Sequence, residues 1–458
     1  MIASDVILIG ASLSHLVAAT NLSGLGKKVT LLTDGGRIGG HFAGFEVEGM
    51  SFDVGMVRFE KGGSQQVQDS TSPYNPSIRG DWLRFGDQAL SFVREYVEIR
   101  RVPCPCDILG GVRVPDYLIA NRLDAFRGLD IELGRDHFSD LHARFKNSHR
   151  SYDSLTYRDA AEFNHGEYIH KKFFKPFIDK VAGAKGDNSQ ARYHRSFWAP
   201  LYYPETLESA SAGLSTSLEE YPFWESASGF TGDFVSAMVD RISKAKNVVI
   251  RDAKIQTLSI IQGETRVSLG SNEWYTAPII GWSLSPQRVH SLLEESKAPP
   301  NLSTCPIAVG FALLEYRRIK QSNSCTFVLD SDFYSYRVVD QDDSFGAERE
   351  WHRVTIEVSP SKFDASLTEQ DISAILINEL HRLFEIPEEY SDSVRLLKFV
   401  ISKGAINVSS PIEVSAINDY LAELGRNLNS AFLSGPLALY GGNSMSEQIV
   451  QGLQFFKE

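Results

Sequence analysis

The sequence has few cysteines, no excess of basic residues and no long apolar run. Four cysteines among 458 residues are too few and too scattered for a disulfide framework, so we expect reduced thiols. Lys and Arg number 46 against 58 Asp and Glu, and the net charge of -12 argues against nucleic acid and anionic membranes as partners. No run of about 18 apolar residues occurs, so no membrane span is predicted.

Signals for other protein classes are missing as well. Asp5 lies where a secretory signal peptide needs a basic residue, so we expect a cytoplasmic protein. Cys104 and Cys106 have no nearby histidine cluster to complete a zinc site, and we predict no metal site. No Gly-x-Ser-x-Gly elbow, His-Glu-x-x-His motif or Walker loop occurs, which argues against hydrolase and protease chemistry. The oligomeric state does not follow from the sequence.

The beginning of the chain has the pattern of a βαβ unit. DVILIG is a short β-branched run that ends at glycine, SHLVAATNLSGLG has helical spacing, and KKVTLL is a second buried strand. In such a unit the first turn and the helix N-terminus bind a pyrophosphate through backbone amides and the helix dipole. The pattern therefore predicts a dinucleotide-binding fold.

The dinucleotide fingerprint in this unit is incomplete. Gly10 keeps the tight turn, whereas Ser12 and His15 replace the second and third glycines. Thr33 ends the second strand, where a carboxylate normally binds the ribose, and Asp34 follows it. Ser12 could donate to a phosphate, and Asp34 could replace the acid by a shift of one residue. His15 could fill space, reach the phosphate or mark a lost cofactor, and packing is the default interpretation.

Segments beyond the βαβ unit resemble the flavoprotein group of the amine oxidases, protoporphyrinogen oxidase and UDP-galactopyranose mutase. Arg37 precedes the glycine pair Gly39 and Gly40, as in the R-[IV]-G-G segment that wraps the diphosphate and flavin in that group. Other pieces follow in the group's order: YIHKKFFKPFIDKVAG, ASGFTGDFVSAMVDRI, NVVIRDAKIQTLSI, YTAPIIGWSLSP and AFLSGPLALYGGNSMSEQIVQGL. The resemblance implies FAD as a noncovalent cofactor.

The resemblance also implies cofactor contacts along the chain. The backbone near Val249 is expected beside adenine, and the final helix is expected to begin beside the flavin pyrimidine. The group's Ala-Gly-Asp is Ser-Gly-Pro here, and Pro436 lacks both a carboxylate and a backbone donor. Because Thr33 and Pro436 remove acceptors, we expect weaker FAD binding than in relatives with intact acids. The predicted cofactor-binding residues are Gly10, Ser12, Asp34, Arg37, Gly39, Gly40, Val249, Gly435, Gly442, Ser444 and Met445.

We predict an α/β fold with a Rossmann-like, doubly wound dinucleotide-binding domain, discontinuous in sequence, and a mixed α+β substrate domain. Residues 1–74, 221–284 and 416–458 are expected to form the FAD-binding domain, and residues 75–220 and 285–415 the substrate domain. The last strand and helix are expected to return beside the first strand. A small-molecule substrate is expected at the domain junction, over the flavin.

Aromatic and basic clusters in the insertions are candidates for substrate binding. In DFYSYRVVD, Tyr336 and Arg337 resemble a Tyr-Arg element of relatives that act on nucleotide sugars, and an arginine fork suits phosphate or carboxylate. Arg353 lies in REWHRVTIEV as a further candidate. The alternation there equally allows Arg353 and Glu357 to form a same-face strand pair on a solvated surface.

Two residues near the expected flavin are candidates for catalysis. His41 follows the glycine pair and titrates near neutral pH, so it could transfer a proton or only close the flavin crevice. Arg58 could meet an anionic substrate or the flavin edge, or be a surface arginine. Mutases of the group have Gly-Pro-His where this chain has Gly55, Met56 and Val57, which argues against the ring-contracting reaction.

These observations predict an FAD-dependent oxidoreductase that acts on a small polar metabolite, with a nucleotide sugar or other glycan precursor favoured by the resemblance. Two alternatives stay open. The fold could have lost or weakened FAD binding and serve as a ligand- or partner-binding protein. It could also be a nonredox flavin-dependent sugar mutase.

Overall fold

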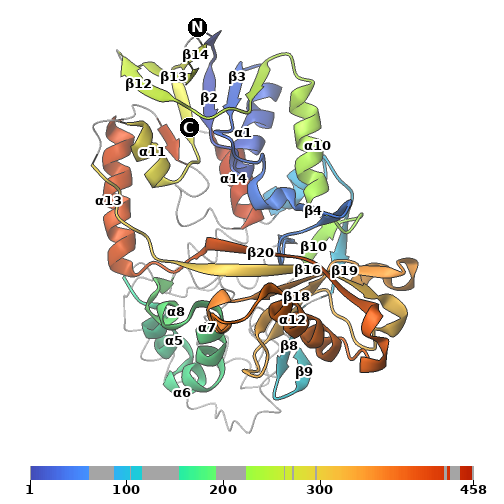
Figure 1. Ribbon diagram of the computed structural model, residues 1–458. Helices are drawn as coiled ribbons and strands as arrows, with labels where there is room; N and C mark the ends of the chain where they lie inside the picture. The colour runs from blue at the N-terminus through green and yellow to red at the C-terminus, as the bar shows by residue number, and fades with distance from the viewer. Residues whose placement is uncertain are drawn as a thin grey trace.

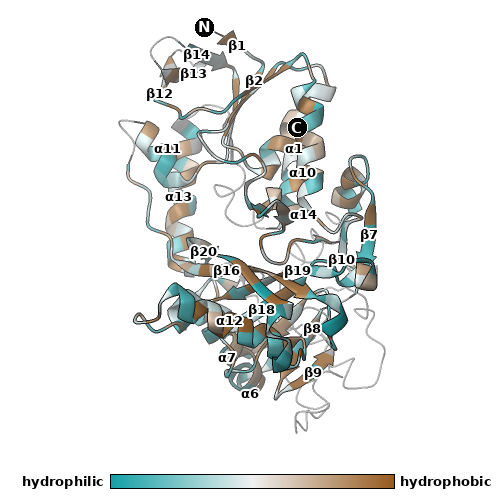
Figure 2. Ribbon diagram, turned by 45° about the vertical axis from the view of Figure 1, so that its right-hand side comes forward, coloured by the Kyte–Doolittle hydropathy of each residue, from teal (hydrophilic) through white to brown (hydrophobic). Residues whose placement is uncertain are grey.

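Two sheets organise the protein in the computed structural model, one above the other in Figure 1. The structure describes residues 2–60, 87–103, 105–115, 154–191, 223–261, 264–270, 273–293, 297–427, 431–433 and 444–455. Figures 1 and 2 both place β16 and β20 across the middle, between the upper sheet and the lower helices. The molecule therefore divides into an upper part with five parallel strands and a lower part with a mixed sheet.

The upper part is a parallel sheet buried on both faces. Its strand order is β11 (Val248–Arg251), β3 (Val29–Leu32), β2 (Val6–Ile9), β15 (Ile279–Trp282) and β21 (Ala431–Leu433), all in parallel pairs. Every residue of β2 and β3 is buried, as the continuous apolar runs predict for central parallel strands. A four-stranded sheet flanks this one, formed by β1 (Ile2–Ala3), β14 (Glu273–Ala277), β13 (Glu264–Gly270) and β12 (Thr257–Ile261).

Helices cover both faces of the parallel sheet. One face packs against α1 (Leu13–Gly24), α10 (Gly232–Ser243) and α14 (Met445–Gln454), and the other against α11 (Pro286–Leu292) and α13 (Pro411–Asn427). The side chains of β2 alternate between these two cores, with Val6 and Leu8 in the first and Ile7 and Ile9 in the second. This doubly wound arrangement confirms the predicted fold class.

The C-terminal elements return to the start of the chain. Gly452 of α14 lies so close to α1 that an added Cβ would be 2.4 Å from the Ser14 carbonyl oxygen. The last strand returns one place further away than predicted, because β21 pairs with β15 instead of β2. The upper part is therefore discontinuous in sequence, while the exact domain boundaries stay a prediction.

The lower part is a seven-stranded sheet with helices on both faces. The strand order is β20 (Val394–Asn407), β16 (Thr304–Glu315), β19 (Trp351–Val358), β18 (Ser335–Asp340), β17 (Thr326–Val328), β8 (Cys106–Leu109) and β9 (Val112–Pro115). Only β17 and β8 pair in parallel among these strands. The helix α12 (Glu369–Leu383) covers one face, and α5 (Tyr157–His165), α6 (Glu167–Ile169), the π-helix η3 (His170–Phe174), α7 (Lys175–Ala182) and α8 (Ala184–Asn188) lie on the other side.

Two small sheets join the parts. The hairpin of β4 (Phe45–Val47) and β5 (Met50–Phe52) packs on the seven-stranded sheet, with the Phe52 ring edge-on to Phe311 at 5.4 Å between centroids. A three-stranded sheet contains β6 (Phe59–Glu60), β10 (Phe223–Ser226) and β7 (Ile99–Val102). The loop between β5 and β6 therefore runs along the junction of the two parts.

Candidate functional site

The turn between β2 and α1 keeps open backbone donors. Gly10 has a φ of 100°, and Ser12 caps α1 by accepting a hydrogen bond from the His15 amide at 3.3 Å. Within the described part of the chain, the amides of Leu13 and Ser14 have no acceptor. Free amides at a helix N-terminus carry partial positive charge, so this turn suits an anion such as a diphosphate.

His15 fills space behind this turn. The ring is fully buried, and Nδ1 lies 3.0 Å from the Gly10 carbonyl oxygen and 3.2 Å from Ser283 Oγ. An added Cβ on Gly281 of β15 would be 3.0 Å from His15 Nε2, so a glycine on the neighbouring strand makes room for the ring. Burial lowers the pKa of His15 to about 4, which makes the imidazole neutral near pH 7. The packing interpretation of His15 accounts for these contacts.

At the end of β3, Asp34 is bound by a protein partner. Its two carboxylate oxygens accept from Arg288 Nε at 2.7 Å and Nη2 at 2.8 Å, and Oδ1 also accepts from the Ile255 amide at 2.8 Å. The preceding Thr33 donates its hydroxyl to Asp252 Oδ1 at 2.6 Å. The predicted cofactor contact of Asp34 stays a prediction, and this carboxylate already holds α11 against the sheet.

The loop after β3 contains the predicted glycine pair. Gly39 has a φ of 82°, donates its amide to the Ala11 carbonyl at 2.7 Å, and would bring an added Cβ within 2.5 Å of Val235 Cγ1 on α10. Gly40 has a φ of 60°, is exposed, and has no atom within 4 Å of an added Cβ. Gly39 is therefore required by packing, whereas Gly40 faces open space.

Arg37 and His41 flank this glycine pair. The Arg37 guanidinium donates to the carbonyls of Ala43 and Gly44 and thereby closes the loop on itself. The His41 ring lies 3.9 Å from the Phe42 ring between centroids. Burial lowers the pKa of His41 to about 4, although the side chain is exposed to solvent. Because the side chain is exposed, solvent opposes this lowering of the pKa.

The remaining predicted cofactor residues lie in three places. Val249 is in the middle of β11, paired with Thr30, and not at the strand end where ligands of such sheets bind. Gly435, Pro436 and Gly442 are outside the described residues. Ser444 caps α14 ahead of Met445, and in that first turn the buried hydroxyl of Ser446 has no hydrogen-bond partner among the described residues.

Arg58 is buried, so the surface alternative for it is wrong. Its Nη1 lies 3.2 Å from Glu225 Oε2 and 3.9 Å from Asp53 Oδ2, while Nη2 is buried without a hydrogen-bond partner in the described structure. Asp53 also accepts from the amide and hydroxyl of Thr231. Burial raises the pKa of Asp53 to about 6, against the opposing charge of Arg58. Arg58 therefore balances two buried carboxylates at the junction.

Arg353 is held by carboxylate and carbonyl partners. Its Nη2 and Nε bind the two oxygens of Asp342 at 2.7 and 3.0 Å, and Nη1 donates to the Ser51 carbonyl at 2.6 Å. The alternative of a solvated pair with Glu357 is wrong, because Glu357 is 2% exposed and binds Arg337 instead. Arg353 thus ties β19 to the β4–β5 hairpin, and a role in substrate binding stays a prediction.

Arg337 and Tyr336 meet on the carboxylate of Glu357 from the neighbouring strand. Arg337 donates Nε at 2.7 Å and Nη2 at 2.6 Å to its two oxygens, and the Tyr336 hydroxyl donates at 3.0 Å. Gly55 contacts this cluster so closely that an added Cβ would be 2.4 Å from Glu357 Oε1. The structure therefore brings Tyr336 and Arg337 together, and it brings the junction loop to them.

Sequence reasoning missed the partners of these residues: Asp252, Arg288, Glu225 and Asp342. Asp252 follows the strand run NVVIR directly, which is the signal that could have identified an acid at the end of a strand. Arg288 and Asp342 lie far along the chain from Asp34 and Ser51, and spacing alone carries no signal for them. The described residues contain no group of three or more His, Cys, Asp or Glu that could hold a metal ion.

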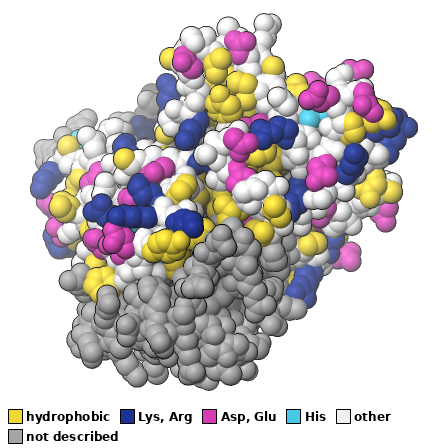
Figure 3. Space-filling view, turned by 90° about the horizontal axis from the view of Figure 1, so that it is seen from below, with side chains coloured by type: hydrophobic (Ala, Val, Ile, Leu, Met, Phe, Trp, Pro, Cys, Tyr) yellow, Lys and Arg dark blue, Asp and Glu magenta, His cyan; other side chains and the backbone are white. Residues whose placement is uncertain are grey.

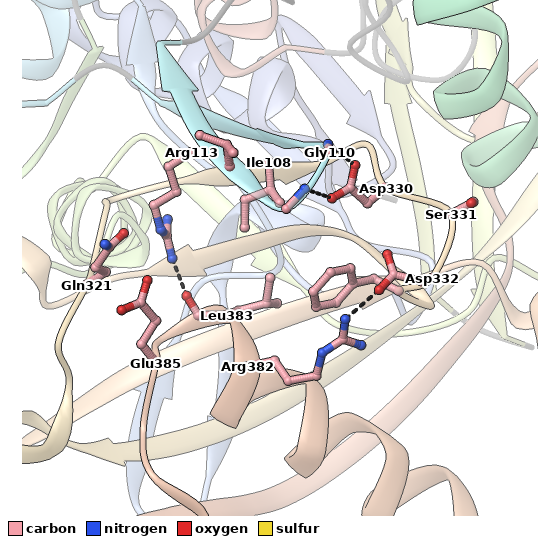
Figure 4. Close-up of a pocket in the computed structure, with 13 residues that line it drawn as sticks. Ile108, Gly110, Arg113, Gln321, Asp330, Ser331, Asp332, Arg382, Leu383 and Glu385 are labelled. Atoms are coloured by element: carbon pink, nitrogen blue, oxygen red, sulfur yellow. Dashed lines mark hydrogen bonds and ion pairs between the residues drawn. The ribbon is translucent and has the colours of Figure 1, made fainter. Parts of the chain in front are cut away.

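A separate hollow of about 790 Å³ lies at the β8–β9 end of the lower sheet (Figure 4). Several of its charged side chains bind within the protein: Asp330 accepts from the Gly110 and Gly111 amides, and Arg382 pairs with Asp332. It lies away from the carboxyl edge of the parallel sheet, and we assign it no ligand.

Seen from below, Lys and Arg lie beside Asp and Glu on the described surface (Figure 3). Across the described residues, no helix has the length and apolarity to cross a bilayer.

Comparisons with known proteins agree with this architecture. Residues 8–70 match the family described as an NAD(P)-binding Rossmann-like domain, and no curated protein sequence matches the chain. A reduced UDP-galactopyranose mutase has a similar structure, with a TM-score of 0.69, 13% identity and coverage of 99% of this chain and 93% of that chain. A proposed protoporphyrinogen oxidase from Exiguobacterium sp. 255-15 has a TM-score of 0.64 and 13% identity, with coverage of 98% of this chain and 97% of that chain. Cyclohexylamine oxidase from Brevibacterium oxydans IH-35A has a TM-score of 0.61 and 15% identity, with coverage of 98% of this chain and 97% of that chain. At these identities the likeness concerns the fold.

Proposed function

From the fold of the FAD-dependent amine oxidase-like flavoproteins, we propose that this chain binds FAD noncovalently and oxidises a small polar metabolite. One observation carries the proposal: at the carboxyl edge of the parallel sheet, the amides of Leu13 and Ser14 have no acceptor among the described residues, and Gly40 has open space beside it. Ligands of doubly wound sheets bind at this edge. The bound flavin would supply the hydride chemistry.

The residues present fit this cofactor. The first-turn amides of α1 would hold the diphosphate, and Gly40 leaves room for close approach because an added Cβ there meets nothing within 4 Å. Ser446 lies in the first turn of α14, the helix expected beside the flavin pyrimidine. Its buried hydroxyl has no hydrogen-bond partner among the described residues, and a polar ligand atom there would provide one. His41, exposed beside the glycine pair, would be an imidazole that can accept a proton.

For the substrate we infer an anionic or polar metabolite, with a nucleotide sugar or another glycan precursor as the favoured class. The similarity to the UDP-galactopyranose mutase structure supports the fold on which this inference rests. The buried, unpartnered Nη2 of Arg58 supports an anionic group, because a buried guanidinium nitrogen without an acceptor is costly. Arg337 and Arg353 already bind Glu357 and Asp342, so we do not base the substrate class on them.

One observation favours the second candidate, a ligand-binding protein of the same fold that has weakened FAD binding. Asp34 and Thr33 stand at the position of the ribose-binding acid, and both are bound by protein partners, Arg288 and Asp252. A ribose would then meet a strand end without a free acid on β3. The two candidates differ in whether flavin-free protein binds FAD.

The experiment is a titration of FAD into flavin-free protein, followed by visible absorbance and flavin fluorescence. Wild type is expected to bind saturably. Gly40→Asp is expected to weaken binding by more than about 100-fold through repulsion of the diphosphate, whereas the matched variant Gly40→Asn keeps wild-type affinity within a few fold, since both residues tolerate a positive φ. No saturable binding by wild type, or equal affinities of the two variants, would contradict the proposed site.

A further inference from the structure

The end of β3 lacks an acid, but the strand beside it supplies one. The strands β3 and β11 are parallel neighbours, and their register pairs Leu32 with Arg251. Thr33 and Asp252 therefore follow side by side at the same edge of the sheet. The Thr33 hydroxyl donates to Asp252 Oδ1 at 2.6 Å, so the carboxylate lies directly against the residue that occupies the usual acidic position.

Asp252 is open to a ligand in a way that Asp34 is not. The Asp34 side chain is 7% exposed, and both of its oxygens bind Arg288. Asp252 is exposed, and within the described residues its second oxygen, Oδ2, has no hydrogen-bond or ion-pair partner. A carboxylate in this state can accept two further hydroxyl donors.

We propose that Asp252 accepts hydrogen bonds from the adenosine ribose hydroxyls of FAD, in place of the acid that β3 lacks. This inference rests on the proposed function. In doubly wound folds the ribose lies at the carboxyl edge of the first strands, where a carboxylate accepts from its hydroxyls. Thr33 is a positioning residue: it donates to Asp252 and accepts from the Gly35 amide at 3.3 Å, which fixes the direction of its own hydroxyl.

The arrangement also predicts what happens when the missing acid is put back. A glutamate at position 33 would place a second carboxylate beside Asp252, and two adjacent like charges repel. Thr33→Glu alone is therefore expected to weaken FAD binding. Exchanging the two residues, Thr33→Glu together with Asp252→Thr, keeps one acid and one hydroxyl and is expected to restore most of the affinity.

The test compares ligands with and without the adenosine ribose, in flavin-free full-length protein. Asp252→Ala is expected to weaken FAD and ADP by roughly 10- to 100-fold, the range for charged hydrogen bonds, and Asp252→Asn by less. FMN, which lacks the adenosine, is expected to bind all variants alike. Asp240→Ala removes an exposed acid from α10 and is the charge-matched control, expected to leave FAD affinity unchanged.

A comparison of ADP with 2'-deoxy-ADP isolates the hydroxyl contact by calorimetry. Wild type is expected to lose affinity for the deoxy analogue, whereas Asp252→Ala and Thr33→Val are expected to distinguish the two ligands much less. Normal FAD affinity in Asp252→Ala and Asp252→Asn would overturn the role of Asp252 while leaving FAD binding intact. Absence of FAD, ADP and FMN binding in wild type would overturn both the proposed function and this inference.

Discussion

The two sheets differ in whether their polar groups are already bound within the protein. In the lower sheet, the forks of Arg337 and Arg353 are bound by the buried carboxylates of Glu357 and Asp342. At the carboxyl edge of the upper sheet, backbone amides and one oxygen of Asp252 face no protein partner among the described residues. A ligand gains most where donors and acceptors are still open, so we propose that the upper edge is the binding surface and that the lower arginines hold the structure together.

Two buried histidines, one in each part, have pKa values shifted in opposite directions. His15, behind the upper edge, is neutral because burial lowers its pKa to about 4. His352, in the lower sheet, has Nδ1 2.8 Å from Asp340 Oδ2 and Nε2 3.0 Å from the Gly346 carbonyl oxygen. Both partners accept hydrogen bonds, so this geometry favours the protonated form of the His352 ring. Burial lowers its pKa, but the bond to Asp340 outweighs this and the pKa is raised.

The largest effect is expected from breaking one buried ion pair of the lower sheet. Arg337→Ala leaves Glu357 buried without its cation, which costs about 3 to 5 kcal/mol of unfolding free energy. The control, Arg337→Met with Glu357→Leu, removes both charges and is expected to recover much of this loss. Urea unfolding at pH 7 measures both variants. A single variant as stable as the double one would show that the pair is not structural.

The next effect is a loss of stability in acid that originates at His15. Its pKa is depressed in the folded state, so the contribution is present above pH 6.5 and is lost as the pH falls toward 4. The drop from 6.5 to about 4 corresponds to about 3 kcal/mol. His15→Gln is expected to remove this part of the acid sensitivity in urea unfolding at pH 7 and pH 4.5. An unchanged acid slope in the variant would rule out a neutral, buried His15.

The smallest effect is expected at His352 and has the opposite sign. Its pKa is raised, so its contribution is fully present below pH 6.5 and is lost as the pH rises through the folded-state value. The loss is limited because a neutral ring still keeps one of its two hydrogen bonds. His352→Gln is expected to flatten the decline of the unfolding temperature on the alkaline side. A wild-type-like decline in that variant would show that His352 is not the group that titrates.

The sequence was informative where local pattern decides structure. Apolar runs predicted β2 and β3 as buried parallel strands, and the ordered resemblance predicted the return of the C-terminal helix to α1. The alternation in β19 allowed a solvated face, whereas both faces of that strand are covered and Glu357 is buried. Alternation reveals two faces of a strand but not what covers them.

The backbone turns of the candidate site could be predicted from the sequence, whereas the side-chain partners around them could not. The turn at Gly10 and the loop at the glycine pair could be predicted because glycines indicate the local backbone conformation. The partners of Thr33 and Asp34 come from β11 and α11, more than two hundred residues along the chain. Which of several acids is free to bind a ligand depends on such distant pairings, and these follow only from the fold.

Hydrogen exchange with and without FAD tests the contrast between the sheets most directly. The account predicts that FAD slows exchange in peptides that cover Gly10–Leu16, Gly39–Gly44 and Arg251–Lys254, the segments that line the proposed binding edge. Peptides that cover Ser335–Asp340 and Trp351–Val358 are expected to exchange at the same rate in both states, because their polar groups are already bound within the protein. Protection confined to these lower strands, or no protection at saturating FAD, would contradict the account.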